Sequence, residues 1–152
     1  MQVDRVFDRT GEFVPQLEGL RASLHHVGIV VASEDEAQRL ARLFGLQEDF
    51  RGFVDRYQAL CVFARGPEGS PIEFVVPGGG VLKTFNGGGG GIHHIALEVD
   101  DLTEATALLA AQRTQLLEPS PVKGAGPFLC NFLAPTAKRR FIVELVQTVA
   151  VS

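Results

Sequence analysis

The chain repeats a short pattern of histidines and apolar residues at an offset of 68 positions. Residues 24–31 read LHHVGIVV and residues 92–99 read IHHIALEV, so the histidine pair at 25–26 aligns with the pair at 93–94. Both runs are mostly apolar and contain β-branched residues, which predicts a strand in each. A repeat of this kind means that one structural unit occurs twice, and this restricts the fold more than any overall composition does.

The same offset carries on into a helix behind each strand. Ser33 and Glu36 form a capping-box pattern, and Asp101 and Glu104 repeat it. A capping residue followed three positions later by glutamate marks the start of a helix. Behind the caps, small and apolar residues fall at helical spacing: Ala37, Leu40, Ala41 and Phe44 in the first copy, and Ala105, Leu108 and Leu109 in the second. Each copy therefore begins with a strand and then a helix.

Three further strands are predicted in each copy. The apolar runs that predict them are 46–54, 57–65 and 71–76, and then 114–118, 127–133 and 140–147. The chain is therefore predicted to be an α+β protein of two tandem βαβββ modules. The expected organisation is an N-terminal arm at 1–22 and a single domain at 23–152, made of a module at 23–76, a Gly-rich linker at 77–91 and a module at 92–148. A helical turn is expected within the linker, from Val81 to Phe85.

Composition excludes several classes of protein. The formal net charge is −4, and no basic face is apparent, which argues against a nucleic-acid partner. No apolar run approaches the ~20 residues that cross a bilayer, and the first residues do not resemble a signal peptide, so a cytoplasmic protein without a membrane partner is expected. Cys61 and Cys130 stand among apolar neighbours and are interpreted as buried thiols.

Four polar residues interrupt the apolar strands at places related by the repeat. His26 and His94 lie in the first strands of the two modules, and Glu73 and Glu144 lie in the last. A carboxylate among apolar neighbours pays a large desolvation penalty unless it is paired or bound to a cation. Two imidazoles and two carboxylates suit one divalent ion, whose identity among Co, Ni, Zn, Mn, Fe and Mg stays open.

Three other polar residues accompany this set. Strand alternation places His25 and His93 on the opposite faces of their strands, where packing or support of a ligand is expected. Glu98 follows His94 on the same face and is a rival ligand or an acid near the site.

The motifs LHHVGIVV, IEFVVP, GGGIHHIALEVDD, GAGPFLCNFLAPTAK and FIVELVQ resemble the vicinal oxygen chelate (glyoxalase/bleomycin resistance/dioxygenase) superfamily. The resemblance runs from Leu24 to Gln147 and is strongest to the methylmalonyl-CoA epimerase branch. It implies a cupped mixed β-sheet around a metal site. By position, it implies the ligands His26, Glu73, His94 and Glu144, the set that the repeat also selects.

The resemblance implies a metal-dependent isomerase or epimerase of a small-molecule CoA or carrier-protein thioester, acting through a metal-stabilised enolate. Glu144 and Glu98 are the candidate catalytic acids and bases. Cations for the CoA phosphates are available at Lys83, Lys123, Lys138, Arg139 and Arg140. A homodimer is expected. The alternatives are a glyoxalase-like lyase, an extradiol-type dioxygenase, and a metal-free module that binds a small ligand.

The sequence departs from the epimerase pattern at one place. The resemblance implies an acid/base glutamate on the third strand of the first module, but the stretch from Tyr57 to Arg65 has no carboxylate, and Cys61 or Val62 takes that place. Another group must then carry the proton, and the candidates are Glu48, Asp55, Glu98 or a ligand carboxylate.

Overall fold

The structure is a computed structural model, and it describes residues 6–7, 13–14, 22–135 and 141–150. Two short strands come first, β1 (Val6–Phe7) and β2 (Phe13–Val14). The first module comprises β3 (Ser23–Val30), α1 (Glu34–Leu43), β4 (Gln47–Val54), the 3-10 turn Asp55–Tyr57, β5 (Ala59–Arg65) and β6 (Ile72–Pro77). The 3-10 segment Val81–Gly88 follows, as expected for the linker. The second module comprises β7 (Gly91–Glu98), α2 (Leu102–Ala111), β8 (Val122–Lys123), β9 (Phe128–Phe132) and β10 (Ile142–Thr148).

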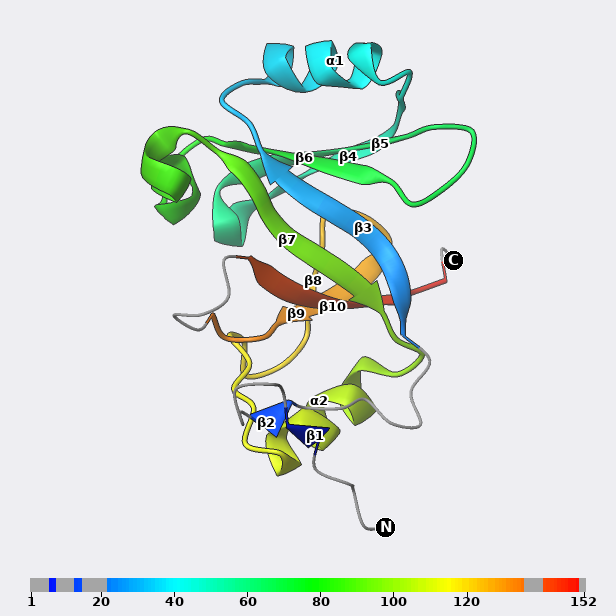
Figure 1. Cartoon of the computed structure of the whole chain (residues 1–152), viewed down its shortest axis with the longest axis vertical. Coiled ribbons are helices and arrows are strands. Elements are labelled where there is room, and N and C mark those ends of the chain that lie inside the picture. Colours follow the sequence, from blue (N-terminus) through cyan, green and yellow to red (C-terminus); the bar gives the residue numbers. More distant parts are fainter. Residues whose placement is uncertain (1–5, 8–12, 15–21, 136–140, 151–152) are drawn as a thin grey trace.

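One curved mixed sheet joins the two modules, in the strand order β4-β5-β6-β3-β7-β10-β9-β8. From each end of the sheet to its centre, the strands follow the same order within their module: second, third, last and first. The first strand of each module pairs in parallel with the last strand of its own module, and β3 and β7 pair antiparallel at the centre. Figure 1 shows these two central strands side by side, with α1 and α2 at opposite ends of the molecule. The predicted fold of two βαβββ modules in one cupped sheet is confirmed.

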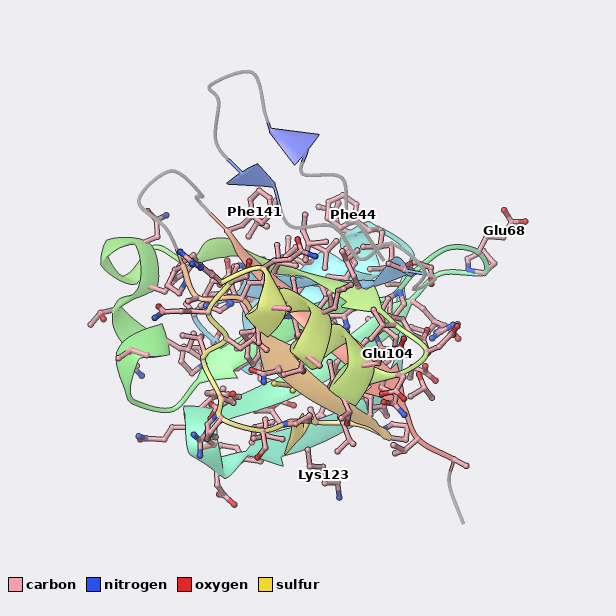
Figure 2. All side chains as sticks on the ribbon, turned by 90° about the horizontal axis from the view of Figure 1, so that it is seen from below. Phe44, Glu68, Glu104, Lys123 and Phe141 are labelled. Atoms are coloured by element: carbon pink, nitrogen blue, oxygen red, sulfur yellow. The ribbon has the colours of Figure 1, made fainter. Side chains whose placement is uncertain are left out.

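The helices begin at the predicted caps. The Ser33 side chain accepts a hydrogen bond from the Glu36 backbone N–H at 3.2 Å, and Asp101 accepts one from the Glu104 N–H at 2.9 Å. These side chains satisfy backbone donors that a helix start leaves without a partner. Each helix then covers the outer face of its own module, as the view onto α2 in Figure 2 shows for the second module.

Strand alternation separates an inner core from the outer helix-covered cores. On β5, Cys61 and Phe63 belong to the inner cluster while Val62 and Ala64 pack with Ala37 of α1. The inner cluster lines the concave face and receives Phe128, Cys130 and Phe132 of β9 from the second module. The concave face is therefore built from both modules.

Two details of the second module differ from the prediction. The strand expected at 114–118 is wrong, because only an isolated bridge from Leu116 to Leu133 forms there. A short strand, β8, instead lies between the expected strands 114–118 and 127–133. Its two residues pair with Cys130 and Leu129. Strand pairing depends on a partner far along the chain, and local apolar content does not reveal that partner.

Two expectations concern regions that the structure describes only in part. The arm expected at 1–22 lies mostly outside the described residues, which show β1 paired antiparallel with β2 there. The module and linker boundaries stay a prediction. Among the described residues, no helix is both long enough and apolar enough to cross a bilayer.

Candidate metal centre

The four predicted ligands come from four adjacent strands at the centre of the sheet. His26 lies on β3, Glu73 on β6, His94 on β7 and Glu144 on β10. The pairing brings them together, because Gly28 lies opposite both Glu73 and His94, and Ala96 lies opposite both His26 and Glu144. Each module therefore supplies one imidazole and one carboxylate at places related by the repeat. All four residues are buried.

The donor atoms converge on one point. His26 Nε2 lies 3.1 Å from Glu73 Oε2 and 3.2 Å from Glu144 Oε2. His94 Nε2 lies 2.8 Å and 3.1 Å from the same two oxygens, and the two Nε2 atoms are 3.1 Å apart. One ligand atom from each residue lies within 4.8 Å of all the others.

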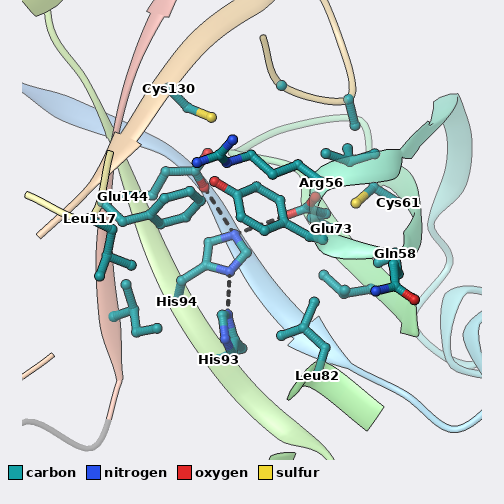
Figure 3. A pocket seen from close by; sticks show the side chains of 18 of the residues that line it. Arg56, Gln58, Cys61, Glu73, Leu82, His93, His94, Leu117, Cys130 and Glu144 are labelled. Atoms are coloured by element: carbon teal, nitrogen blue, oxygen red, sulfur yellow. Dashed lines mark hydrogen bonds and ion pairs between the residues drawn. The ribbon is translucent and has the colours of Figure 1, made fainter. Parts of the chain in front are cut away.

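These separations fit a metal ion. Two donors at about 2.1 Å from an ion and at right angles to each other are about 3.0 Å apart. The distances of 2.8–3.2 Å between the two Nε2 atoms and from each Nε2 to the carboxylate oxygens match this value. Imidazole nitrogens with carboxylate oxygens form a mixed donor set that suits a divalent ion and leaves positions open for a substrate. The residues present therefore fit a divalent metal, and Figure 3 shows the His94 imidazole aimed at both carboxylates.

The cluster attracts positive charge. Burial opposes charge on the imidazoles, but the hydrogen bonds and charges of Glu144 and Glu73 outweigh it, raising the pKa of His26 and raising the pKa of His94 to about 10. Burial likewise works against the carboxylates, yet the two histidines lower the pKa of Glu73 and of Glu144. Two buried carboxylates thus require two positive charges close by, which protons on the histidines or one divalent ion would supply.

Gly28 makes room for the His94 ring. A Cβ atom at position 28 would lie 2.0 Å from His94 Cε1 and 2.4 Å from its Nδ1. Such contacts are far inside the ~3.5–4.0 Å of ordinary carbon contacts. The absence of a side chain at this position therefore allows one ligand to reach the centre.

The expected placement of His25 and His93 is wrong. The register between β3 and β7 shifts at two points, and His25 on β3 and His93 on β7 are the extra, unpaired residues there. A bulge of this kind re-aims a side chain, so adjacent residues need not alternate between faces. His93 lines the same cavity as His94, and the His25 ring lies 5.3 Å from that of Phe128 in the inner core. Burial and the adjacent His94 lower the pKa of His93 to about 4.

The centre lies at the wall of a cavity of about 360 Å³. Its apolar lining comes from both modules and the linker, and includes Val54, Val75, Leu82, Leu117, Phe128, Phe132 and Ile142. Cys61 and Cys130 also line it, and each lies within hydrogen-bonding reach of the ligand carboxylate of its own module. Burial, reinforced by those carboxylates, raises the pKa of both thiols, so both are neutral. They are buried thiols, as predicted.

The other predicted acids do not reach this cavity. Glu98 accepts a hydrogen bond from the Thr148 hydroxyl at 2.5 Å and is not among the lining residues. Glu48 is exposed and paired with Arg51, and Asp55 borders an adjoining hollow. Among the described residues, the carboxylates that line the cavity are the ligands Glu73 and Glu144.

The predicted phosphate-binding cations are spread over several places. Lys123 borders the adjoining hollow together with Arg56, whereas Lys83 borders neither. Lys138, Arg139 and Arg140 lie outside the described residues.

Sequence reasoning missed a cluster of polar residues at the edge of the cavity. The Arg56 Nε donates to Glu118 Oε1 at 2.7 Å, and the Tyr57 hydroxyl donates to the same oxygen at 3.1 Å. Asn131, which is fully buried, holds both the N–H and the carbonyl of Glu118. Arg56 and Tyr57 line the cavity and come from the first module, while Glu118 comes from the second. No local signal could have shown this link, because its partners are 62 and 61 positions apart.

Comparisons with known proteins agree with the fold. Residues 25–132 match the family described as the Glyoxalase/Bleomycin resistance protein/Dioxygenase superfamily. The mitochondrial methylmalonyl-CoA epimerase of Dictyostelium discoideum is 32% identical over 127 residues, which cover 80% of this chain and 76% of that protein.

Solved structures of similar proteins have the same fold. The crystal structure of methylmalonyl-CoA epimerase from Mycobacterium tuberculosis is 25% identical, with a TM-score of 0.77 over 84% of this chain and 88% of that one. The methylmalonyl-CoA epimerase of Streptomyces coelicolor in complex with 2-nitronate-propionyl-CoA superposes with a TM-score of 0.75 at 20% identity, over 84% of this chain and 97% of that one. The chain therefore belongs to the glyoxalase/bleomycin resistance/dioxygenase superfamily.

Proposed function

We propose that this chain is a metal-dependent epimerase that removes and returns the proton next to the carbonyl of a small CoA thioester. Its relatives support an enzyme of the epimerase type. The observation that carries the proposal is the convergence of His26, Glu73, His94 and Glu144 on one point at the wall of an apolar cavity. We assign these four residues as ligands of one divalent ion.

The bound ion would supply a positive charge that stabilises the negative charge developing on the carbonyl oxygen when the neighbouring proton leaves. The protein supplies the remaining requirements. The four ligands hold the centre rigidly, because each lies on a central strand of the sheet and is buried. The lining is mostly apolar, and apolar surroundings strengthen the electrostatic interactions made beside them.

Glu144 is the proposed proton carrier. Its contacts with the histidines use Oε2, and we assign the other oxygen, Oε1, as the atom that accepts a proton from the substrate carbon. Epimerisation also needs a group on the opposite face of that carbon, and Glu73 is the repeat-related carboxylate in the same cavity. Its contacts with the histidines likewise use Oε2. Glu98 is left out of the proposal because it lies away from the cavity.

Exchange with heavy water tests the proposal. The metal-loaded protein is incubated with each resolved isomer of methylmalonyl-CoA in D₂O, and deuterium at C2 and inversion are followed by NMR. We expect both to occur, and both to fall by at least about 100-fold in Glu144→Gln, as for loss of a general acid–base group. Glu98→Gln is the matched control, with activity close to that of the unchanged protein. Absence of exchange at C2 in the metal-loaded protein would remove the epimerase proposal.

A glyoxalase-like lyase is a second candidate. It is favoured by the observation that the described cavity offers proton-accepting carboxylates only on its two ligand residues. Turnover of a thiol–aldehyde adduct, without exchange in the CoA thioester, would support this alternative. The cytoplasmic location and the homodimer stay predictions.

A further inference from the structure

Two imidazoles that are not ligands lie directly behind the two that are. His25 Nδ1 is 2.7 Å from His26 Nδ1, and His93 Nδ1 is 3.0 Å from His94 Nδ1. Adjacent residues on a regular strand point to opposite faces and cannot make such a contact. The contacts exist here because each pair sits at a bulge in the β3–β7 ladder, with His25 and His93 as the extra residues.

We infer that His25 and His93 are positioning residues that accept a hydrogen bond from the Nδ1–H of the metal ligands His26 and His94. The inference rests on the metal site of the proposed function and adds to it the groups that orient two of its ligands. Metal-binding histidines nearly always donate their second ring N–H to a fixed acceptor, which sets the tautomer and the direction of the ring. In this chain the acceptor is another imidazole in both modules.

The positions of the protons follow from the distances. The Nε2 atoms of His26 and His94 face both carboxylates and each other, so Nε2 is the atom that would bind the ion. A neutral imidazole that binds through Nε2 carries its proton on Nδ1. The Nδ1 atom of the neighbouring histidine must then be unprotonated to accept it. His25 and His93 therefore hold their own protons on Nε2.

Several contacts hold the two accepting rings in place. The His25 ring packs edge-on against Phe128 at 5.3 Å, and the His93 ring packs edge-on against Phe85 at 4.9 Å. Figure 3 shows His93 directly behind the His94 ring, on the side away from the carboxylates. Both accepting residues are only partly buried, whereas the ligands are buried.

Charge explains why an imidazole serves better here than the carboxylate that often fills this role. The centre already holds two buried carboxylates. An acidic acceptor behind each ligand would add two more negative charges within a few ångströms, and like charges in a buried site are costly. A neutral imidazole orients the ligand without adding charge. Two bulges at repeat-related positions are thus explained by one requirement of the site.

Paired substitutions separate hydrogen bonding from packing. Asparagine places its amide oxygen close to the position of the histidine Nδ1, whereas leucine fills similar space without an acceptor. We expect His93→Leu and His25→Leu to weaken Zn²⁺ binding by about 10–100-fold, the usual cost of losing an outer-sphere partner. His93→Asn and His25→Asn should recover most of that loss. Binding is measured by competition with a chromophoric chelator, and the Co²⁺ absorption bands report the ligand geometry.

A measurement on the unchanged protein completes the test. Long-range ¹H–¹⁵N NMR of the Zn²⁺-loaded protein should show His26 and His94 protonated on Nδ1, and His25 and His93 protonated on Nε2. Leucine variants that bind Zn²⁺ as tightly as the unchanged protein, or asparagine variants as weak as the leucine variants, would overturn the inference alone. Nδ1-protonated His25 and His93 would do the same. An unchanged protein that binds no divalent metal would overturn both the inference and the proposed site.

Discussion

Replacing Gly28 by alanine should remove His94 from the centre. The added Cβ would lie 2.0 Å from His94 Cε1, and 2.4 Å from both ring nitrogens. Reaching an ordinary contact of about 3.5 Å requires the ring to move by about 1.5 Å. A ligand bond tolerates only about ±0.2 Å. The ring of His93, 5.2 Å from that of His94, restricts this movement on one side.

The expected result is a loss of Zn²⁺ affinity of at least about 100-fold, or about 2.8 kcal/mol. Titration against a chromophoric chelator measures it, and circular dichroism checks that the variant is folded. Ala96 provides a matched control, because it occupies the repeat-related position, opposite His26. Ala96→Gly removes a methyl group instead of adding one, so its affinity should change by less than the ~10-fold that marks a lost outer-sphere partner. If Gly28→Ala binds Zn²⁺ as tightly as the unchanged protein, the proposed role of His94 as a ligand is refuted.

Three other predictions concern protonation and packing. Without metal, the raised pKa of His94 stabilises the fold fully below about pH 6.5, and this stabilisation is lost as the pH rises through about 10. The lowered pKa of Glu73 stabilises the fold above about pH 4.5, and this stabilisation is lost on further acidification. The pKa of His93, lowered to about 4, favours unfolding as the pH falls from about 6.5 to 4. Urea unfolding with a chelator should therefore show the greatest stability near pH 6.5, and a midpoint still rising at pH 9 would contradict this reasoning. Zn²⁺ binding at pH 7 should release protons, because His94, with a pKa of about 10, is protonated before the metal binds. Calorimetry in buffers of different ionisation enthalpy should therefore give different heats of binding. Equal heats would count against proton release. Leu109→Ala should cost about 2–5 kcal/mol of stability, because Leu109 is buried between α2 and the outer face of the sheet. Zn²⁺ affinity should stay unchanged. A parallel loss of affinity would show that this outer core supports the centre.

The repeat was enough to predict two βαβββ modules and the four residues that meet at the centre, while the cupped sheet was expected from the family resemblance. A strand alternates its faces, and two copies of one unit place equivalent residues at equivalent positions. His26 and Glu73 therefore predicted His94 and Glu144 without any knowledge of the pairing. The helix starts at Ser33 and Asp101 were equally predictable, because capping depends on residues within one turn.

The errors share one physical cause. His25 and His93 were assigned to the wrong faces because a bulge is a property of two paired strands and not of either strand alone. The strand expected at 114–118 reduced to a single bridge, since a strand needs a partner at the right register. The Arg56–Glu118 contact joins residues from different modules and left no local pattern.

The amino-acid order thus specifies which donors exist, in which modules they lie and which helices begin where, because those properties depend on near neighbours and on duplication. The folded chain specifies that the imidazole nitrogens lie 2.8–3.2 Å from each other and from the carboxylate oxygens, and that Gly28 leaves space for one ring. It also specifies the two bulges that place a second imidazole behind each histidine. Those properties depend on how strands from separate modules pair, and pairing arises only when distant segments pack against each other.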